Sequence, residues 1–228
     1  MYLETIRGIF VSEYKNRFLC NVLIDNEMVE CYVPSSSRIQ NYLDLKDCEV
    51  LLTKNKSSKS RTSLSLFAVN IQQSFVILNL NKVNSIIEEL INRREIYKDN
   101  IFNVCREKVL ENKYKSDLYL VDTEGNTEII IEAKGIISDQ RDVYFPQVNS
   151  ERSLEQLIKI NELLLDGKKV HYYFVSLSPF TKKIHLKEDS DYTMLLKKCI
   201  VHGLEIKPLR ILYDGRSIQH DEEIKIAY

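Results

Sequence analysis

The sequence lacks the features that define several large classes of protein. No apolar run within its 228 residues approaches the roughly 20 residues that cross a bilayer. The N-terminus has no apolar region of the signal-peptide kind, so we expect a cytoplasmic protein without membrane contact. No internal repeat and no low-complexity segment is evident. The length suits one large domain or two small ones, with a real hydrophobic core in either case.

Residues that form disulfides or bind soft metals are few and scattered. The five cysteines are odd in number and include no Cys-x-x-Cys pair, which argues against a disulfide framework and against structural zinc. The four histidines are equally dispersed, so histidine ligation of a metal is not expected. The net charge is only −1, whereas proteins that bind nucleic acid through bulk charge are usually strongly basic.

Positive charge is nevertheless concentrated in one short segment. Residues 54–61 read Lys-Asn-Lys-Ser-Ser-Lys-Ser-Arg and carry four positive charges without a negative one. A solvated hairpin loop explains such a run, and so does contact with a phosphate backbone. The charge run alone favours the hairpin loop.

The first part of the chain has the pattern of a small β-barrel. Short apolar segments separated by turn residues predict strands at residues 8–11, 18–24, 28–33, 49–52, 65–69 and 75–78. Asp25 and Asn26 form the expected hairpin turn between two of them. This many short strands in about 80 residues favours an antiparallel barrel of the oligonucleotide/oligosaccharide-binding (OB) type. A barrel that serves only as a spacer is the plainer alternative.

The pattern changes to alternating strands and helices near residue 83. Ser85 to Glu88 reads Ser-Ile-Ile-Glu, a capping box that predicts the start of a helix between a 1–82 barrel and an 83–228 domain. Strands are then predicted at 104–110, 118–121, 128–133, 170–175 and 209–213, with helices at 150–166 and 192–202 that end at Gly167 and Gly203. This order favours an α/β layer with a mixed sheet behind the barrel, a two-domain chain.

The hairpin expected around residues 124–125 places three charged residues on one face. Symmetric pairing puts Asp117 opposite Glu132, and Lys134 follows on the same face because side chains alternate along a strand. Two opposed carboxylates repel each other unless a hard divalent cation with oxygen ligands neutralises them. The adjacent lysine can orient or deprotonate a water, or stabilise charge on a phosphate. The backbone carbonyl of Ala133 could supply another ligand.

A plain ion pair at the edge of a sheet is the alternative interpretation of the same residues. Charged pairs at strand ends are common, and the Asp-x(n)-Glu-x-Lys pattern alone favours the ion pair. The shared face and the apolar run of residues 129–131 before Glu132 count the other way, because a buried strand should not end in two charges without a purpose. Spacing by itself leaves both interpretations open.

Several motifs spread over nearly the whole chain match a known pattern. The second half contains Asp117, within an element of the type Ser-Arg-x-Asp-Phe, and Glu132-Ala133-Lys134, at a Glu-Val-Lys position. The matching elements elsewhere are Gly8-Ile-Phe10, Arg17-Phe18, the turn Pro34 to Arg38, Ser60-Arg61-Thr62, Asn79, Asn84, Phe145-Pro146 and Arg152. Together they resemble the sugar fermentation stimulation protein A family.

The resemblance implies a fold and a metal site. It implies an OB-like barrel followed by a mixed-sheet, restriction-endonuclease-like PD-(D/E)xK domain, with Asp117, Glu132 and Lys134 as catalytic residues. It implies Mg²⁺ or Mn²⁺ held by the two carboxylates and the Ala133 carbonyl. Glu107 matches a family glutamate and is a further candidate ligand, a role for which Glu111 competes.

The resemblance also implies which residues contact nucleic acid and where the chain has diverged. The predicted contacts are Arg17, Phe18, Arg38, Lys59 and Arg61 on the barrel, and Arg152 and Gln156 beside the metal site. Tyr14 is an alternative stacking surface to Phe18, which as a strand phenylalanine could instead belong to the core. Positions that depart from the family pattern are Lys115, Gln147, Ser153 and Gln156.

We therefore expect a metal-dependent phosphodiesterase that acts on DNA or RNA. The alternative is a DNA-binding regulatory protein linked to sugar metabolism that does not cleave its target. A third interpretation, an interaction module, requires neither nucleic-acid binding nor metal binding.

Overall fold

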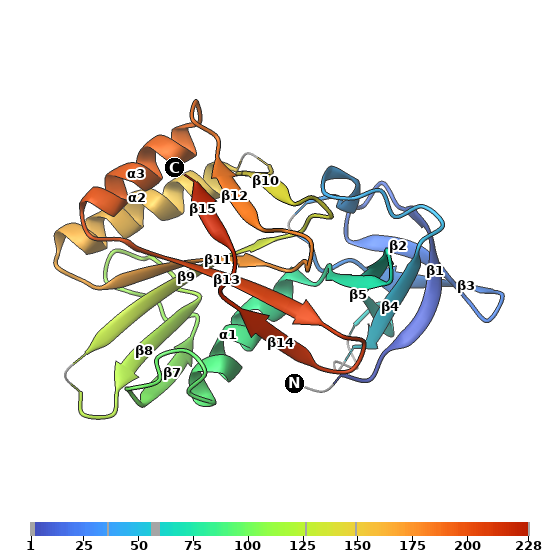
Figure 1. The fold of residues 1–228 in the computed structure, drawn as a ribbon, viewed down its shortest axis with the longest axis horizontal. Coiled ribbons are helices and arrows are strands. Elements are labelled where there is room, and N and C mark those ends of the chain that lie inside the picture. The colour runs from blue at the N-terminus through green and yellow to red at the C-terminus, as the bar shows by residue number, and fades with distance from the viewer. Residues whose placement is uncertain (1–2, 36, 56–59, 126, 149, 228) are drawn as a thin grey trace.

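The computed structural model describes residues 3–35, 37–55, 60–125, 127–148 and 150–227 of the chain (Figure 1). A β-barrel formed by the N-terminal residues lies beside a larger mixed sheet and its helices, formed by the rest of the chain. Lys59, one of the predicted nucleic-acid contacts, lies outside the described residues, together with residues 56–58 of the same basic segment.

The N-terminal sheet closes on itself into the predicted OB barrel. Its described strands are β1 (Ile6–Glu13), β2 (Leu19–Ile24), β3 (Glu27–Tyr32), β4 (Glu49–Lys54), β5 (Leu64–Ile71) and β6 (Ser74–Ile77), with a 3₁₀ turn η1 (Ile39–Asn41) between β3 and β4. They pair in the order β3-β2-β1-β4-β5-β6, and a parallel contact between Tyr32 and Ser65 joins β3 to β5. The β2–β3 turn is tight because Asp25 and Asn26 both adopt positive φ, as the sequence predicts.

The second part of the chain is the predicted mixed sheet with helices on both faces. Its described elements are the turn η2 (Leu80–Lys82), helices α1 (Val83–Asn92), α2 (Glu151–Leu165) and α3 (Asp191–Val201), and strands β7 (Phe102–Arg106), β8 (Leu118–Asp122), β9 (Glu128–Ile136), β10 (Asp142–Phe145), β11 (Val170–Ser176), β12 (Lys183–Leu186), β13 (Glu205–Tyr213), β14 (Ile218–Asp221) and β15 (Lys225–Ala227). The main sheet has the order β14-β13-β11-β9-β8-β7, with β9, β11 and β13 parallel at its centre. A small parallel sheet, β10-β12-β15, lies apart from it.

Each face of the main sheet has its own hydrophobic core. Ile130 and Tyr172 point to the face covered by α2 and α3, whereas Ile131 and Tyr173 point to the face that carries α1 (Figure 1). The α1-side core continues into the barrel, so the two parts of the chain share one buried cluster. Within the described residues, no helix combines the length and the apolar character that a membrane span requires.

The predicted start of the first helix was wrong. The capping box placed the helix start at Ser85, but α1 begins at Val83, after Lys82. Its first turn continues directly from the 3₁₀ turn η2, and the Ser85 hydroxyl donates to the Lys82 carbonyl at 2.8 Å from inside the helix. The Glu88 carboxylate forms an ion pair with the end of β7 instead of reaching back to a helix cap.

The strand predicted at residues 104–110 is also displaced. It spans Phe102–Arg106 and ends there because Glu107 adopts a left-handed conformation with φ 55°. The chain then folds back on itself, and the Ser116 N–H donates to the Lys108 carbonyl at 3.0 Å. The four short strands β10, β12, β14 and β15 have no counterpart among the sequence predictions.

Candidate functional site

The hairpin that carries the candidate site has the predicted register. Leu118 pairs with Ile131, and Val121 pairs with Glu128. The regular ladder ends at Leu118, and the N–H of the preceding residue, Asp117, donates to the Ile131 carbonyl at 3.1 Å, so Asp117 lies beside the Ile131–Glu132 peptide. The predicted pairs Val121–Glu128 and Tyr119–Ile130 are therefore confirmed, and Asp117 lies at the open end of the hairpin, close enough for its charge to raise the pKa of Glu132.

Both oxygens of the Asp117 carboxylate are held by neighbouring elements. Oδ2 accepts from the Ala133 N–H at 2.8 Å, and Oδ1 accepts from the Asn84 side-chain amide at 2.9 Å. Asn84 reaches this position because the start of α1 lies directly on β9: a Cβ at Gly135 would come within 2.6 Å of the Leu80 side chain. The backbone N–H and carbonyl of one strand residue face the same neighbour, so the Ala133 carbonyl also faces the edge occupied by Asp117.

Glu132 is buried, with an exposed fraction of 1%, and both of its oxygens have partners. Oε1 accepts from the Lys134 ammonium at 2.6 Å, and Oε2 accepts from the Tyr114 hydroxyl. Burial raises the pKa of Glu132, the Lys134 charge opposes that rise, and the Asp117 charge adds to it. The charges of the two carboxylates therefore repel each other.

Lys134 connects the hairpin to α2. Its ammonium donates to Glu132 and also to Gln156 Oε1 on α2, at 2.7 Å. Gln156, predicted as a contact beside the metal site, is therefore part of the cluster. Arg152, one turn earlier on α2, is exposed at the protein surface.

The donor set of this cluster fits a hard divalent cation. Two carboxylates and the Ala133 carbonyl offer oxygen atoms only, which suits Mg²⁺ or Mn²⁺ better than a soft metal. Among the described residues, no group of three or more His, Cys, Asp and Glu side chains is close enough to hold a metal. The remaining coordination positions would therefore belong to water or substrate, as is usual for Mg²⁺.

Glu107 is near the pair through its backbone but not through its carboxylate. Its N–H donates to the Asp117 carbonyl at 3.2 Å, whereas its side chain is exposed and forms an ion pair with Lys115 at 2.7 Å. The hydrogen bond from Lys115 and then its charge lower the pKa of Glu107, which keeps it ionised at the surface. Glu111 is exposed as well. The structure places neither glutamate with Asp117 and Glu132.

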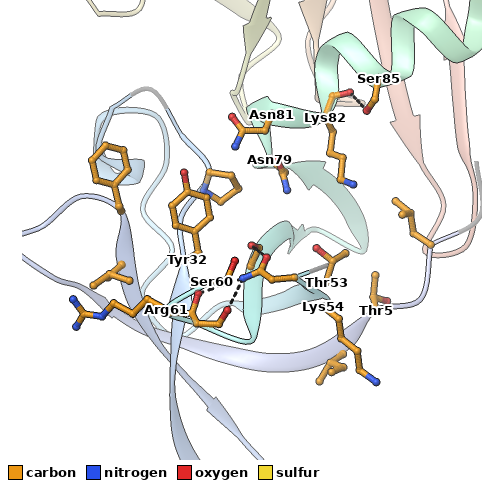
Figure 2. A pocket seen from close by; sticks show the side chains of 18 of the residues that line it. Thr5, Tyr32, Thr53, Lys54, Ser60, Arg61, Asn79, Asn81, Lys82 and Ser85 are labelled. Carbon is orange, nitrogen blue, oxygen red and sulfur yellow. Dashed lines mark hydrogen bonds between the residues drawn. The ribbon is translucent and has the colours of Figure 1, made fainter. Parts of the chain in front are cut away.

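A groove of about 1460 Å³ lies between the barrel and the first turn of α1 (Figure 2). Phe18 and Arg61, two of the predicted nucleic-acid contacts, line it. Arg38 is outside the lining and donates to the Lys15 carbonyl at 2.7 Å. Arg17 is also outside it, with its guanidinium 4.7 Å from the centre of the Phe18 ring. Of the predicted barrel contacts that the structure describes, Phe18 and Arg61 therefore share one groove, whereas Arg17 and Arg38 do not line it.

Two residues of the cluster had no role in the sequence predictions. Asn84, which holds Asp117, is one of two asparagines that match the family pattern, and the sequence predicts no role for it. Tyr114, which holds Glu132, lies in the irregular segment before β8 and gives no local signal in the sequence. Its hydroxyl could be assigned only once the fold placed the ring behind Glu132.

Comparison with known proteins matches both parts of the chain. The sugar fermentation stimulation protein RE domain matches residues 81–217, and the SfsA N-terminal OB domain matches residues 13–78. A sugar fermentation stimulation protein homolog of Ruminiclostridium cellulolyticum is 27% identical over 231 residues, covering 99% of this chain and 98% of the relative. A homolog of Clostridium perfringens is 27% identical over 192 residues, covering 83% and 82%.

One solved structure has the same fold throughout. The structure of Pyrococcus furiosus SfsA in complex with Ca²⁺ superimposes with a TM-score of 0.85 and 19% sequence identity. The superposition covers 100% of this chain and 98% of that one. The arrangement of an OB barrel and an endonuclease-like mixed sheet is therefore shared by the two proteins.

Proposed function

This chain belongs to the sugar fermentation stimulation protein family, and from that premise and its carboxylate cluster we propose that it hydrolyses phosphodiester bonds of nucleic acid with a divalent metal ion. The observation that carries the proposal is the convergence of Asp117, Glu132 and Lys134 at one end of a hairpin. Asp117 accepts a hydrogen bond from Asn84, Glu132 accepts one from Tyr114, and Lys134 donates one to Gln156, so each is fixed by a different part of the chain. An ion pair of purely structural value would not need two carboxylates beside one ammonium.

The residues of the cluster would have separate roles in metal binding, water activation and positioning. Asp117, Glu132 and the Ala133 carbonyl would hold Mg²⁺ or Mn²⁺, which supplies positive charge to a phosphate and lowers the pKa of a bound water. The Lys134 ammonium would orient the attacking water or stabilise charge that develops on the phosphate. Gln156 keeps that ammonium in place, and Tyr114 keeps Glu132 in place. The Ca²⁺ complex of the Pyrococcus furiosus relative supports a hard-cation site in this family.

The proposal is tested by comparing two alanine variants. Asp117→Ala removes a ligand, so we expect it to lose both Mn²⁺ binding in calorimetry and cleavage of DNA or RNA. Lys134→Ala removes only the ammonium, so we expect cleavage to be lost while Mn²⁺ binding largely remains. Lys115→Ala, which removes an exposed ammonium paired with Glu107, is the control and should match the wild type. Wild-type cleavage by both site variants would place the active site elsewhere.

One observation favours the second candidate, a DNA-binding regulatory protein that does not cleave. Gln147 stands where the family pattern has an aspartate, and its side-chain amide is engaged with the backbone of Ile137, donating to its carbonyl at 2.6 Å. Gln147 therefore holds the backbone at Ile137 and contributes no negative charge. Nucleic-acid binding that persists without any cleavage in Mn²⁺ would favour this candidate.

A further inference from the structure

Basic residues outnumber acidic residues in the lining of the groove between the barrel and α1. Among its lining residues Lys54, Arg61, Lys82 and Arg106 are basic, and only Glu4 is acidic. The whole chain, by contrast, has 32 basic and 33 acidic residues. Arg61 is paired with Glu30 at 3.1 Å and Arg106 is paired with Glu88, so these two charges are partly offset. Lys54 and Lys82 add positive charge to this groove, which we call the barrel–helix groove. An anionic polymer is the complementary ligand.

One wall of the barrel–helix groove presents aromatic rings. Phe18 is 39% exposed, and its ring is nearly parallel to that of Tyr32, with 12° between the planes and 6.4 Å between the centres. The exposed Arg17 guanidinium lies over Phe18. A base stacked on an aromatic ring is bound more strongly than an exposed cation, so a base can displace this guanidinium or stack against it. Rings at this position suit flat, unpaired bases.

An unsatisfied amide lies in the same groove. Asn79 is 5% exposed, and its Oδ1 has no hydrogen-bond partner among the described residues. Buried polar atoms are normally hydrogen-bonded, so this amide indicates a missing partner. Figure 2 shows Asn79 with its side-chain nitrogen directed into the space between Tyr32 and Lys82. Rotation of the amide can present either a donor or an acceptor to the edge of a base.

Two lining residues of the barrel–helix groove are neighbours of residues that contact or adjoin Asp117. Ser85, which lines it, directly follows Asn84, and Asn84 donates to Asp117. Arg106, which also lines it, pairs with Leu118, the residue after Asp117. Asp117, Glu132 and Lys134 are not themselves in the lining, but on α1 and on β7 the lining comes within one residue of a neighbour of Asp117.

We propose that the barrel–helix groove binds a single-stranded segment of nucleic acid and leads it to the carboxylate cluster. Its bases would stack on Phe18 and Tyr32 and meet the Asn79 amide, and its phosphates would lie near the basic residues. A duplex cannot use these features, because its bases already stack on one another and their edges are paired. The binding inference rests on the groove alone, and its link to cleavage rests on the proposed function.

The test is a binding measurement without any divalent ion. Fluorescence anisotropy in EDTA compares a labelled DNA strand of about 16 nucleotides, within the site sizes of OB barrels, with the same strand in a duplex and with RNA of the same sequence. We expect the wild type to bind the DNA or RNA single strand at least about tenfold more tightly than the duplex, a difference of one stacked base or more.

Two variants with matched exposure separate the groove from the rest of the barrel. Phe18→Ala should weaken binding of the single strand by about 5- to 150-fold, the loss of one base–aromatic stack. Tyr14→Ala is the control: Tyr14 is 38% exposed, donates to Asn21 at 3.0 Å and is absent from the groove lining, so its loss should leave affinity unchanged. Lys54→Gln should reduce the salt dependence of binding by about 0.7 in the slope of log K against log salt.

Three results would overturn the proposal: a duplex bound as tightly as the single strand, no binding of any probe, or an unchanged affinity in a folded Phe18→Ala. The outcome is separable from that of the proposed function. Single-strand binding without cleavage in Mn²⁺ would remove the hydrolytic activity and leave the groove assignment intact. Cleavage without a preference for binding single strands would leave the hydrolytic activity intact and remove the groove assignment.

Discussion

Replacing Tyr114 with phenylalanine removes one hydroxyl group from behind the proposed metal site. In the native structure that hydroxyl donates to Glu132 Oε2, and both side chains are almost completely buried. Phenylalanine keeps the ring and its packing, so the change isolates the hydrogen bond. Without it, Oε2 has lost its donor in a place that water does not reach, and the ionised form of Glu132 is less stable.

The expected loss can be worked from this burial. A hydrogen bond to a charged group contributes about 1.5–3 kcal/mol, which corresponds to roughly 10- to 150-fold in a binding constant. Loss of a residue that orients a metal ligand typically reduces metal affinity by about 10- to 100-fold, in the same range. We therefore expect Tyr114→Phe to bind Mn²⁺ at least about tenfold more weakly in calorimetric titration at neutral pH.

Tyr173→Phe is the matched control for this experiment. Tyr173 is also buried, its hydroxyl donates to Tyr97 at 3.1 Å, and it points to the opposite face of the sheet. It should lose stability without losing Mn²⁺ affinity. A folded Tyr114→Phe protein that binds Mn²⁺ as tightly as the wild type would refute the view that Glu132 is a ligand held in place by Tyr114.

Two predictions concern stability. Burial lowers the pKa of His171 from 6.5 to about 4, so the unfolded chain binds the proton more tightly and this contribution to stability is lost as the pH falls from 6.5 towards 4. Denaturant unfolding at several pH values should show that His171→Gln removes up to about 3 kcal/mol of this pH dependence. A free energy of unfolding that falls just as steeply between pH 6.5 and 4 in the variant would contradict the lowered pKa of His171. Phe67, fully buried in β5, packs edge-on against Tyr213 of β13 at 5.1 Å, so Phe67→Ala should lower the free energy of unfolding by about 3–5 kcal/mol. A loss below about 1 kcal/mol would show that this contact between barrel and sheet is not part of the folded core.

The features predicted correctly from sequence are those with a local cause. The β8–β9 register follows from one turn, with Gly125 at φ 74°, and from alternation along two short strands. The ends of α2 and α3 follow from Gly167 and Gly203, both at positive φ. The barrel strands follow from apolar segments bounded by turn residues. In each case the information lies within about ten residues of the feature it determines.

The features that were missed depend on contacts distant in sequence. The start of α1 is set by packing of Leu80 and Val83 against Gly135, and that contact outweighs the capping box at Ser85. The small sheet pairs Asp142 with Lys183 in short parallel strands, which have no hydrophobic period long enough to detect. The same limit applies to the site: the hairpin itself brings two carboxylates together, but the residues that hold them come from α1 and from the segment before β8.

The most direct test of the account is cleavage of nucleic acid by the purified wild-type protein in Mn²⁺ and in EDTA. The substrates are single-stranded and double-stranded DNA and RNA, and calorimetry measures Mn²⁺ binding in parallel. The account predicts that Mn²⁺ binds and that at least one substrate, with single strands preferred, is cut only when Mn²⁺ is present. Intact substrates throughout, together with no Mn²⁺ binding, would contradict the assignment of Asp117, Glu132 and Lys134 as a hydrolytic metal site.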